Sequence, residues 1–338
     1  MMLWLLAPAV GLAAFLLTAL ALQYAVKNQI IDLPSDRSSH SFPTPRGGGI
    51  AIVIAFLLGL SFLYFSDVYD RWLLFGTLVS GAGIAITGFI DDHRDLSVKW
   101  RLMIHFLAAA FVLYSLDGGL PQINFMGFSI SPSWVTQAIT LVYLVWLLNL
   151  FNFMDGIDGI ASIEAVTVTL AGGILFILLG SSSMAILSFV LCASAFGFLL
   201  WNFPPAKIFM GDVGSGFLGF IIGILSLHAA QQHSALIWSW IILLGVFIVD
   251  ATFTLLRRIM RGENVSEPHR NHAYQRASRF YGSHKVVSLA VGMINLCWLF
   301  PWAIAVAMNY IDGTFALAIA YTPLIIIVMR FSIAKNVS

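Results

Sequence analysis

The chain has 338 residues, of which 59% are hydrophobic and 10% are charged, and its formal net charge is +1. A soluble domain carries roughly 25% charged residues, so a soluble fold could not bury this much apolar surface. Cys192 and Cys297 both lie in apolar runs, which excludes a disulfide scaffold, and the small net charge gives no general attraction to nucleic acid. The composition predicts an all-α, polytopic integral membrane protein.

Eleven stretches are long and apolar enough to cross the ~30 Å hydrocarbon core of a bilayer as helices. They lie near residues 3–24, 48–65, 72–90, 102–116, 134–151, 162–179, 183–201, 214–229, 236–256, 287–307 and 313–330. The runs at 102–116 and 214–229 are short, so ten or twelve spans stay open. The first stretch is too long for a removable signal peptide and has no basic region before it. We expect one transmembrane domain over 1–338, with a basic cytoplasmic loop at 257–286.

The charge distribution predicts how the protein is oriented. With eleven spans the two termini lie on opposite sides, and one face then carries sixteen of the 17 Lys and Arg residues, whereas the other keeps only Arg71. Loops rich in Lys and Arg stay in the cytoplasm. We therefore expect an external N-terminus, a cytoplasmic C-terminus, and an active site on the cytoplasmic face, where the polar motifs gather.

The first loop on that face, 32–49, holds three prolines and three consecutive glycines. These residues fix an irregular path and let a ligand approach the backbone closely. Arg37, His40 and Arg46 are suited to meet an anion there. The alternative is a tight loop whose arginines merely follow the positive-inside distribution.

An aspartate pair, Asp91 and Asp92, directly follows the apolar run 81–90. Adjacent carboxylates at a membrane boundary repel each other and lose hydration, so they indicate that a cation or a proton is handled there. A solvated helix end is the simpler alternative.

The fifth span ends in a run of amides and carboxylates. Asn149, Asn152 and Asp155 recur every three residues, so on a continuing helix they share one face. Gly156 and Gly159 stand before and after Asp158, and they would open the backbone to a ligand. Oxygen-bearing groups on one face suit a hard cation or a nucleotide.

The segment 202–216 contains Asn202 and Lys207, and it places Asp212 among glycines where the eighth span begins. A carboxylate at a helix N-terminus with exposed N–H groups is a place to gather Mg²⁺ and phosphates together. Simple N-capping by Asp212 is the alternative, but it does not account for Lys207 or for the glycine spacing.

Asp250 lies inside the ninth expected span, and an intramembrane carboxylate is a candidate functional group. In the loop beyond it, His269 and His272 stand three residues apart. Two histidines at this spacing suit a transition metal, but their basic neighbours favour recognition of a diphosphate. We expect the residues up to Lys285 to form a basic helix on the membrane surface.

Together these blocks, which extend from Asp32 to His272, resemble the polyprenyl-phosphate N-acetylhexosamine-1-phosphate transferases. The most specific blocks are Asn-Phe-Met-Asp-Gly-Ile-Asp-Gly at 152–159 and Lys-Ile-Phe-Met-Gly-Asp-Val-Gly-Ser at 207–215. Relatives that act in enterobacterial common antigen or teichoic acid synthesis end the last loop in His-x-His-His, where Tyr274 and Gln275 stand here. In this respect the chain is similar to the O-antigen-initiating branch of Gram-negative bacteria.

The resemblance implies roles for the matching residues. Asp91 and Asp92 match the catalytic aspartate pair, and Asp212 matches the magnesium-binding aspartate. Asn152 and Asp155 belong to the supporting nucleotide-and-metal block. Substrate contacts are expected from Arg46, Asn149, Asp158, Asn202, Lys207, Asp250, His269 and His272, with Asp158 near the nucleoside and His272 near the diphosphate.

The resemblance also implies a reaction in the bacterial inner membrane. A UDP-N-acetylhexosamine (a GlcNAc, FucNAc or QuiNAc donor) passes its sugar 1-phosphate to undecaprenyl phosphate, which gives undecaprenyl-diphospho-sugar and UMP. The expected cofactor is Mg²⁺, with Mn²⁺ as a substitute. A homodimer is compatible with this function, and no nucleic-acid partner is expected.

Two other functions would also use aspartates in a membrane protein. A CDP-alcohol phosphotransferase needs Asp-Gly-x-x-Ala-Arg, which the sequence Asp-Gly-Ile-Ala-Ser at 158–162 does not match. A transporter of a sugar or lipid phosphate would use Asp250 as a coupling residue, and it should place polar groups near the bilayer midplane at a repeat interface. Here the polar motifs gather on one face and no internal repeat is visible.

Overall fold

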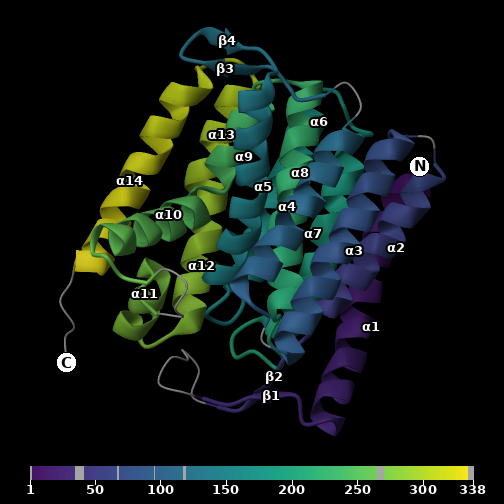
Figure 1. Cartoon of the computed structure of the whole chain (residues 1–338), viewed down its shortest axis with the longest axis vertical. Coiled ribbons are helices and arrows are strands. Elements are labelled where there is room, and N and C mark those ends of the chain that lie inside the picture. Colours follow the sequence, from purple (N-terminus) through teal and green to yellow (C-terminus); the bar gives the residue numbers. More distant parts are fainter. Residues whose placement is uncertain are drawn as a thin grey trace.

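The computed structural model describes residues 2–34, 42–66, 68–94, 96–116, 119–264 and 270–333. Its regular structure is almost entirely helical, which confirms the all-α class (Figure 1). A short 3₁₀-helix, η1 (Met2–Leu5), leads into a bundle of eight helices. These are α1 (Leu6–Lys27), α2 (Ile50–Tyr64), α3 (Arg71–His93), α4 (Val98–Ser115), α5 (Trp134–Met154), α6 (Ile160–Leu178), α7 (Ala185–Asn202) and α8 (Asp212–Gln232).

Helix α8 is the centre of this bundle. All of its most apolar 18-residue window is buried inside the protein, compared with 17% for α1 at the periphery. It packs against α5 and α3, and glycine makes the α5 contact possible. A Cβ on Gly219 would lie 2.3 Å from the backbone oxygen of Leu147, so only glycine allows this close approach of the two helices.

The second part of the chain is less regular. It contains α9 (Leu236–Leu243), α10 (Gly245–Met260), α11 (Ala273–Tyr281), α12 (His284–Ile294), the π-helix η2 (Asn295–Leu299), α13 (Phe300–Ala307) and α14 (Gly313–Ile333). The expected span over 236–256 is not one straight helix, because α9 and α10 meet at a 70° bend. Gly245 stands at this bend, where a Cβ would lie 2.9 Å from the ring of Tyr321. Helix α10 consequently runs across the bundle axis (Figure 1).

Nine helical runs in the described ranges are long and apolar enough to cross a bilayer, and the bent pair makes ten. The expected range 48–65 contains helix α2, which has 15 residues and is shorter than these runs. The tenth expected span is carried by α12, η2 and α13 in succession. Each expected range therefore contains helix, while the count of eleven crossings stays a prediction.

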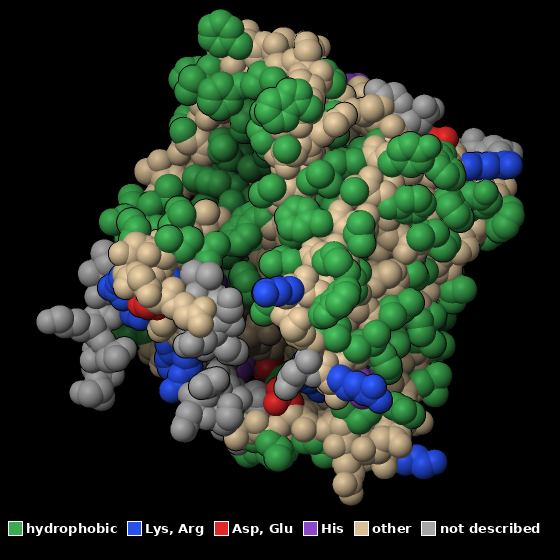
Figure 2. Space-filling view, viewed as in Figure 1, with side chains coloured by type: hydrophobic (Ala, Val, Ile, Leu, Met, Phe, Trp, Pro, Cys, Tyr) green, Lys and Arg blue, Asp and Glu red, His purple; other side chains and the backbone are tan. Residues whose placement is uncertain are grey.

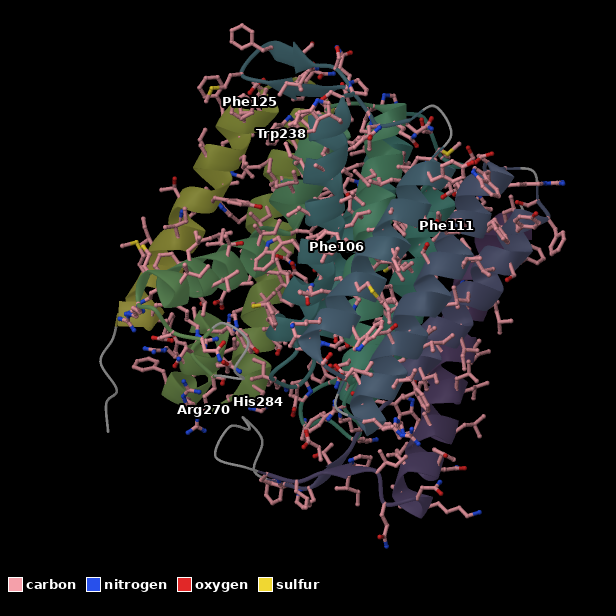
Figure 3. The ribbon with its side chains drawn as sticks, viewed as in Figure 1. Phe106, Phe111, Phe125, Trp238, Arg270 and His284 are labelled. Atoms are coloured by element: carbon pink, nitrogen blue, oxygen red, sulfur yellow. The ribbon has the colours of Figure 1, made fainter. Side chains whose placement is uncertain are left out.

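Two small antiparallel hairpins mark the two ends of the molecule. At one end, β1 (Ile31–Asp32) pairs with β2 (Thr44–Pro45). At the other, β3 (Ile123–Phe125) pairs with β4 (Phe128–Ile130) in a loop for which no element was predicted. Phe125 lies against Trp238 of α9, whose indole N–H donates to the Asn124 carbonyl at 2.7 Å (Figure 3).

The polar side chains also separate along the bundle axis. Figure 2 shows Lys and Arg gathered over the lower half of the visible face, toward the end where β1, β2 and α11 lie. The N-terminal end of α1 lies at the opposite, upper end (Figure 1). This arrangement agrees with the charge count, while the orientation in a membrane stays a prediction.

Candidate active site

A polar cavity of about 260 Å³ opens at the lower end of the bundle, between the end of α5, the loop before α8 and the β1–β2 hairpin. Four aspartates are among its lining residues, namely Asp32, Asp155, Asp158 and Asp212, and Arg46 is the one Lys or Arg that lines it within the described ranges. Such a concentration of carboxylates in a concave site favours a bound cation. We call this the main cavity.

Asp212 lies between two arginines. Its Oδ1 is 3.8 Å from the Arg46 guanidinium, and its Oδ2 is 3.9 Å from that of Arg101. Arg46 also forms an ion pair with Asp92, and Arg101 forms one with Asp91. Each of the two expected catalytic aspartates is therefore held by its own arginine, and Asp212 lies between the two pairs.

Asp92 caps helix α8. Its carboxylate accepts the backbone N–H groups of Asp212 at 3.1 Å and Val213 at 3.2 Å. Gly211 precedes them at φ +76°, and a Cβ there would lie 2.7 Å from Asp92 Oδ2. The first N–H groups of α8, which the sequence predicts to be exposed, are thus bound by a carboxylate of the protein. N-capping by Asp212 is excluded too, since α8 begins with Asp212 itself.

Asp91 lies toward α4 and also forms a side-chain hydrogen bond with Asp212. Besides the ion pair with Arg101, it accepts the backbone N–H of Leu96 at 2.9 Å. It lines a cavity of about 30 Å³ between α3, α4, α5 and α8, together with His105 and Asn149. Neighbours on a helix diverge by about 100°, so one carboxylate lies at the start of α8 and the other in this smaller space.

The end of α5 differs in part from the expectation. The helix stops at Met154, so Asp155 lies just beyond it and does not share a helical face with the asparagines. Asn149 donates its side-chain N–H to the Val145 carbonyl at 2.7 Å and lines the smaller cavity. Asn152 lines both cavities and forms a side-chain hydrogen bond with Asp212.

Asp155, Asp212 and Asn152 line the main cavity together and carry oxygen atoms of the kind that a hard cation prefers. Burial, and next the negative charge of Asp212, raise the pKa of Asp155 to about 7, as expected where carboxylates crowd together. No group of three or more His, Cys, Asp or Glu side chains in the described ranges is arranged to hold a metal ion alone. Mg²⁺ usually takes one or two carboxylates and completes its shell with water and substrate phosphates, so this set fits Mg²⁺.

Asp158 connects the main cavity to a second one. Its Oδ2 accepts the backbone N–H of Ala206 at 3.0 Å, and its Oδ1 lies 3.3 Å from Nδ1 of His284. His284, the first residue of α12, lies at the foot of the molecule (Figure 3). The second cavity measures about 790 Å³ and shares Asp158, Phe209 and His284 with the first. It is rich in cations, which are Lys207, Arg279 and Lys285.

Lys207 and Asn202, both expected to contact substrate, lie in different surroundings. The Lys207 ammonium is exposed in the second cavity and lies 5.1 Å from the centre of the Trp201 ring. Asn202 is 2% exposed; its oxygen accepts hydrogen bonds from the Gly159 N–H and the Ser162 hydroxyl, and its nitrogen donates to the Ile208 carbonyl. Asn202 therefore holds two loops of the main cavity in place.

Asp250 and His272 lie behind the main cavity and do not line it. They are 3% and 4% exposed, with 3.3 Å between Asp250 Oδ1 and His272 Nδ1. Asp250 also accepts the backbone N–H groups of Ala273 and Tyr274, both at 2.9 Å, so it caps α11. We assign Asp250 and His272 to positioning α11, in place of the expected contact with substrate.

Helix α11 presents Tyr274 and Gln275 to the active-site loop. The Tyr274 hydroxyl donates to the Phe153 carbonyl at 3.0 Å, and Gln275 lines the main cavity. His269, and with it Arg37 and His40, lies outside the described residues.

Sequence reasoning missed two residues of the site. The sequence pattern places Arg101 only among the sixteen basic residues of the cytoplasmic face, and His284 only within the basic stretch that ends at Lys285. The sole local signal for Arg101 is that it follows Asp91 by ten residues on the adjoining helix. His284 is 126 residues from Asp158, so no local pattern connects them.

Known bacterial transferases are similar to this chain over most of its length. The sequence profile of glycosyl transferase family 4 matches residues 74–230. A probable undecaprenyl-phosphate N-acetylglucosaminyl 1-phosphate transferase of Bacillus subtilis is 33% identical over 301 residues, which covers 84% of this chain and 79% of the relative. A decaprenyl-phosphate N-acetylglucosaminephosphotransferase of Mycolicibacterium smegmatis is 29% identical over 84% of this chain and 79% of the relative.

A more distant relative has a different sugar substrate in its name. The phospho-N-acetylmuramoyl-pentapeptide-transferase of Streptococcus equi subsp. zooepidemicus is 27% identical over 73% of this chain and 78% of its own length. The profile match contains Asp91, Asp92, Asn152, Asp155 and Asp212, which the structure brings together at the lower end of the bundle. The chain is a member of glycosyl transferase family 4.

Proposed function

We propose that this protein transfers an N-acetylhexosamine 1-phosphate from a UDP-sugar to undecaprenyl phosphate, with release of UMP. The observation that carries the proposal is the set of four aspartates around one cavity, with Arg46 and Arg101 on either side of Asp212, at one end of a membrane-spanning bundle. This arrangement suits a cation and a diphosphate at the level where a lipid head group lies. Family membership supports the same reaction class.

The two cavities suit an elongated donor. Sites for small ligands usually measure about 300–1,000 Å³, so the main cavity alone, at about 260 Å³, is small for a nucleotide sugar. Joined at Asp158 and His284 to the second cavity, it provides enough room. We place the diphosphate beside Asp212 and the nucleoside toward Asp158.

Asp212, Asp155 and Asn152 would hold Mg²⁺, which when bound neutralises charge on the donor diphosphate. An oxygen of the lipid phosphate attacks the β-phosphorus, and the bond from that phosphorus to the oxygen bridging toward the α-phosphate breaks. UMP leaves with that oxygen. Arg46 and Arg101 oppose the repulsion between the two anionic substrates, which is the main barrier to this reaction.

Neither Asp91 nor Asp92 is needed as a base in this scheme. A phosphate monoester has a second pKa of about 6, so it is largely ionised at neutral pH. Both carboxylates are already engaged by an arginine and by backbone N–H groups. We therefore assign them to orienting Arg46, Arg101 and the start of α8.

The proposed location is the bacterial inner membrane, with the N-terminus periplasmic and the site in the cytoplasm. We further propose that the lipid product initiates O-antigen, lipopolysaccharide or a related surface glycan. Tyr274 and Gln275, at the place of two histidines in other relatives, support this branch.

The test is to supply membranes containing this protein with undecaprenyl phosphate, Mg²⁺ and a panel of UDP-sugars. The expected result is a lipid-linked sugar diphosphate, identified by mass spectrometry, together with UMP in equal amount. One diphosphate bond replaces another, so excess UMP should drive the product back to UDP-sugar. Release of UDP or of inorganic phosphate would show that a different bond is cut.

A further inference from the structure

A buried carboxyl group, that of Glu164, has no part in the proposed reaction. Glu164 lies near the start of α6 and is 0% exposed. Its Oε2 accepts a hydrogen bond from Nδ2 of Asn295 at 2.7 Å, and the same nitrogen donates to Thr167 Oγ1 at 2.8 Å. Asn295, at 1% exposure, is the first residue of the π-helix η2.

Two acceptor atoms of this pair have no hydrogen-bond donor, namely Glu164 Oε1 and Asn295 Oδ1. An ionised carboxylate with an unsatisfied oxygen, beside an unsatisfied amide oxygen, would be costly in an apolar interior. A single proton on Glu164 removes both deficits, because the carboxylic acid can then donate to Asn295 Oδ1 while it accepts from Nδ2. We infer that Glu164 is a neutral carboxylic acid in a two-point hydrogen-bonded pair with Asn295.

This pair fastens the C-terminal end of α12, and the start of η2, to the first turns of α6. Gly292 allows the helices to meet closely, since a Cβ there would lie 3.0 Å from Ile163 Cγ2. The π-helix begins directly at Asn295, and a π-turn shifts the register of the side chains that follow. The acid–amide pair fixes this register against α6.

The other end of α12 meets the active site. His284 Nδ1 lies 3.3 Å from Asp158 Oδ1, and the Ser288 hydroxyl donates to the Asp158 backbone oxygen at 2.7 Å. His284 and Ser288 share one face of α12 with Asn295, which directly follows the helix, so fastening Asn295 to α6 holds that face of α12 toward Asp158. Glu164 and Asn295 are thus positioning residues for Asp158. This step rests on the proposed function, in which Asp158 contacts the donor.

Glu164→Gln tests the pair directly. Glutamine keeps both hydrogen bonds, because its amide donates to Asn295 Oδ1 and its oxygen accepts from Nδ2. Glu164→Leu has a similar volume and removes both. Thr169→Val is the matched control, since Thr169 is another fully buried polar residue of α6, its hydroxyl donates to Ala165 of the same helix, and it has no contact with Asn295.

We expect Glu164→Gln and Thr169→Val to keep the melting temperature in detergent and the KM for UDP-sugar of the parent. Glu164→Leu should melt several degrees lower and show a ~10-fold higher KM for UDP-sugar, since buried partners are left unpaired and Asp158 is displaced. Loss of folding or a raised KM in Glu164→Gln would overturn the neutral pair. An unchanged KM in Glu164→Leu would overturn the positioning role.

Infrared difference spectroscopy provides a readout that needs no turnover. The parent minus Glu164→Gln spectrum at neutral pH should contain the C=O band of a protonated carboxyl group. A carboxylate band in its place would overturn the inference. Melting and infrared measurements do not depend on the substrate, so a failure of the proposed function and a failure of this pair are distinguishable.

Discussion

Asp92 accepts the backbone N–H of Asp212 at 3.1 Å, so one active-site carboxylate caps the helix that presents the other. The same group also accepts the N–H of Val213 and pairs with Arg46. Three donors converge on Asp92, which leaves it little capacity to take a proton from a substrate. Its charge instead fixes the start of α8, and with it the place of Asp212 between Arg46 and Arg101.

Asp92→Asn should therefore affect stability and activity together. The amide keeps one acceptor oxygen but loses the charge that binds Arg46. We expect a loss of about 1–2 kcal/mol in folding free energy, as for a lost helix cap, and a fall in kcat of about 10²-fold. Thermal unfolding in detergent and steady-state kinetics check both. An unchanged melting temperature with abolished turnover would indicate that Asp92 acts as a base.

Removal of Asp212, the carboxylate that we propose binds Mg²⁺, separates cation binding from a purely structural role. Asp212→Ala should leave the protein folded and reduce activity by more than ~10³-fold, because both the charge and the metal are lost. Asp70→Ala is the control. Asp70 caps α3 at the opposite end, where it accepts the Leu73 N–H at 2.7 Å, so its removal should cost only about 1 kcal/mol of stability. Normal Mg²⁺ dependence in Asp212→Ala would place the metal elsewhere.

The Mg²⁺ requirement should depend on pH through Asp155. Its pKa, raised to about 7 by burial and by Asp212, lies above the usual 3.8. Protons and cations compete for this carboxylate, so the Mg²⁺ concentration for half-maximal activity should rise as the pH falls from about 8 to 6.

Stability without Mg²⁺ should also depend on pH, because Asp155 binds its proton more tightly in the folded chain than in the unfolded chain. Stability should therefore fall as the pH rises from about 4 to 7, and Mg²⁺ should restore it. Asp155→Asn should weaken both effects, and effects of unchanged size in this variant would contradict the assignment.

Much of the fold follows from hydrophobic length alone. The ranges of apolar sequence locate the helices because a bilayer span has a nearly fixed length. The bend at Leu244 escapes this reasoning, since α9 and α10 are as apolar together as a straight span would be. At this bend Gly245 packs against Tyr321, a contact that a single sequence does not reveal.

The sequence predicts the part of the site whose polar side chains lie close together in one segment of the chain. Asn152, Asp155 and Asp158 are found together because they are neighbours in the chain. Residue type alone did not distinguish Asp250, which caps α11, from Asp212, which lies in the main cavity. That distinction depends on which backbone N–H groups each carboxylate meets, and therefore on tertiary structure.

The orientation in the membrane is open to a reporter test. Sixteen of 17 basic residues on one face predict that a reporter active only in the periplasm works when fused after Arg71 and is silent when fused at Glu263. The reverse pattern would place the main cavity outside the cell, away from any nucleotide sugar.

Gly156 offers a test of the contact between α11 and the active-site loop. A Cβ at Gly156 would lie 2.2 Å from the Tyr274 hydroxyl oxygen and 2.9 Å from Gln275 Nε2. Gly156→Ala must therefore displace α11 or the loop that carries Asp155, and a shift of about 1 Å in an active site reduces turnover by up to ~10²-fold. Gly83→Ala is the control, because a Cβ on Gly83 meets nothing within 4 Å.

Tyr274→Phe decides whether the clash is the cause. Alone it loses the hydrogen bond to the Phe153 carbonyl, at a cost of about 1 kcal/mol. Combined with Gly156→Ala it removes the atom that clashes first, so the double variant should be more active than Gly156→Ala alone, and the two changes should be strongly non-additive. Additive losses in this cycle, or normal turnover in Gly156→Ala, would mean that α11 and the loop move independently and that Tyr274 does not position Asp155.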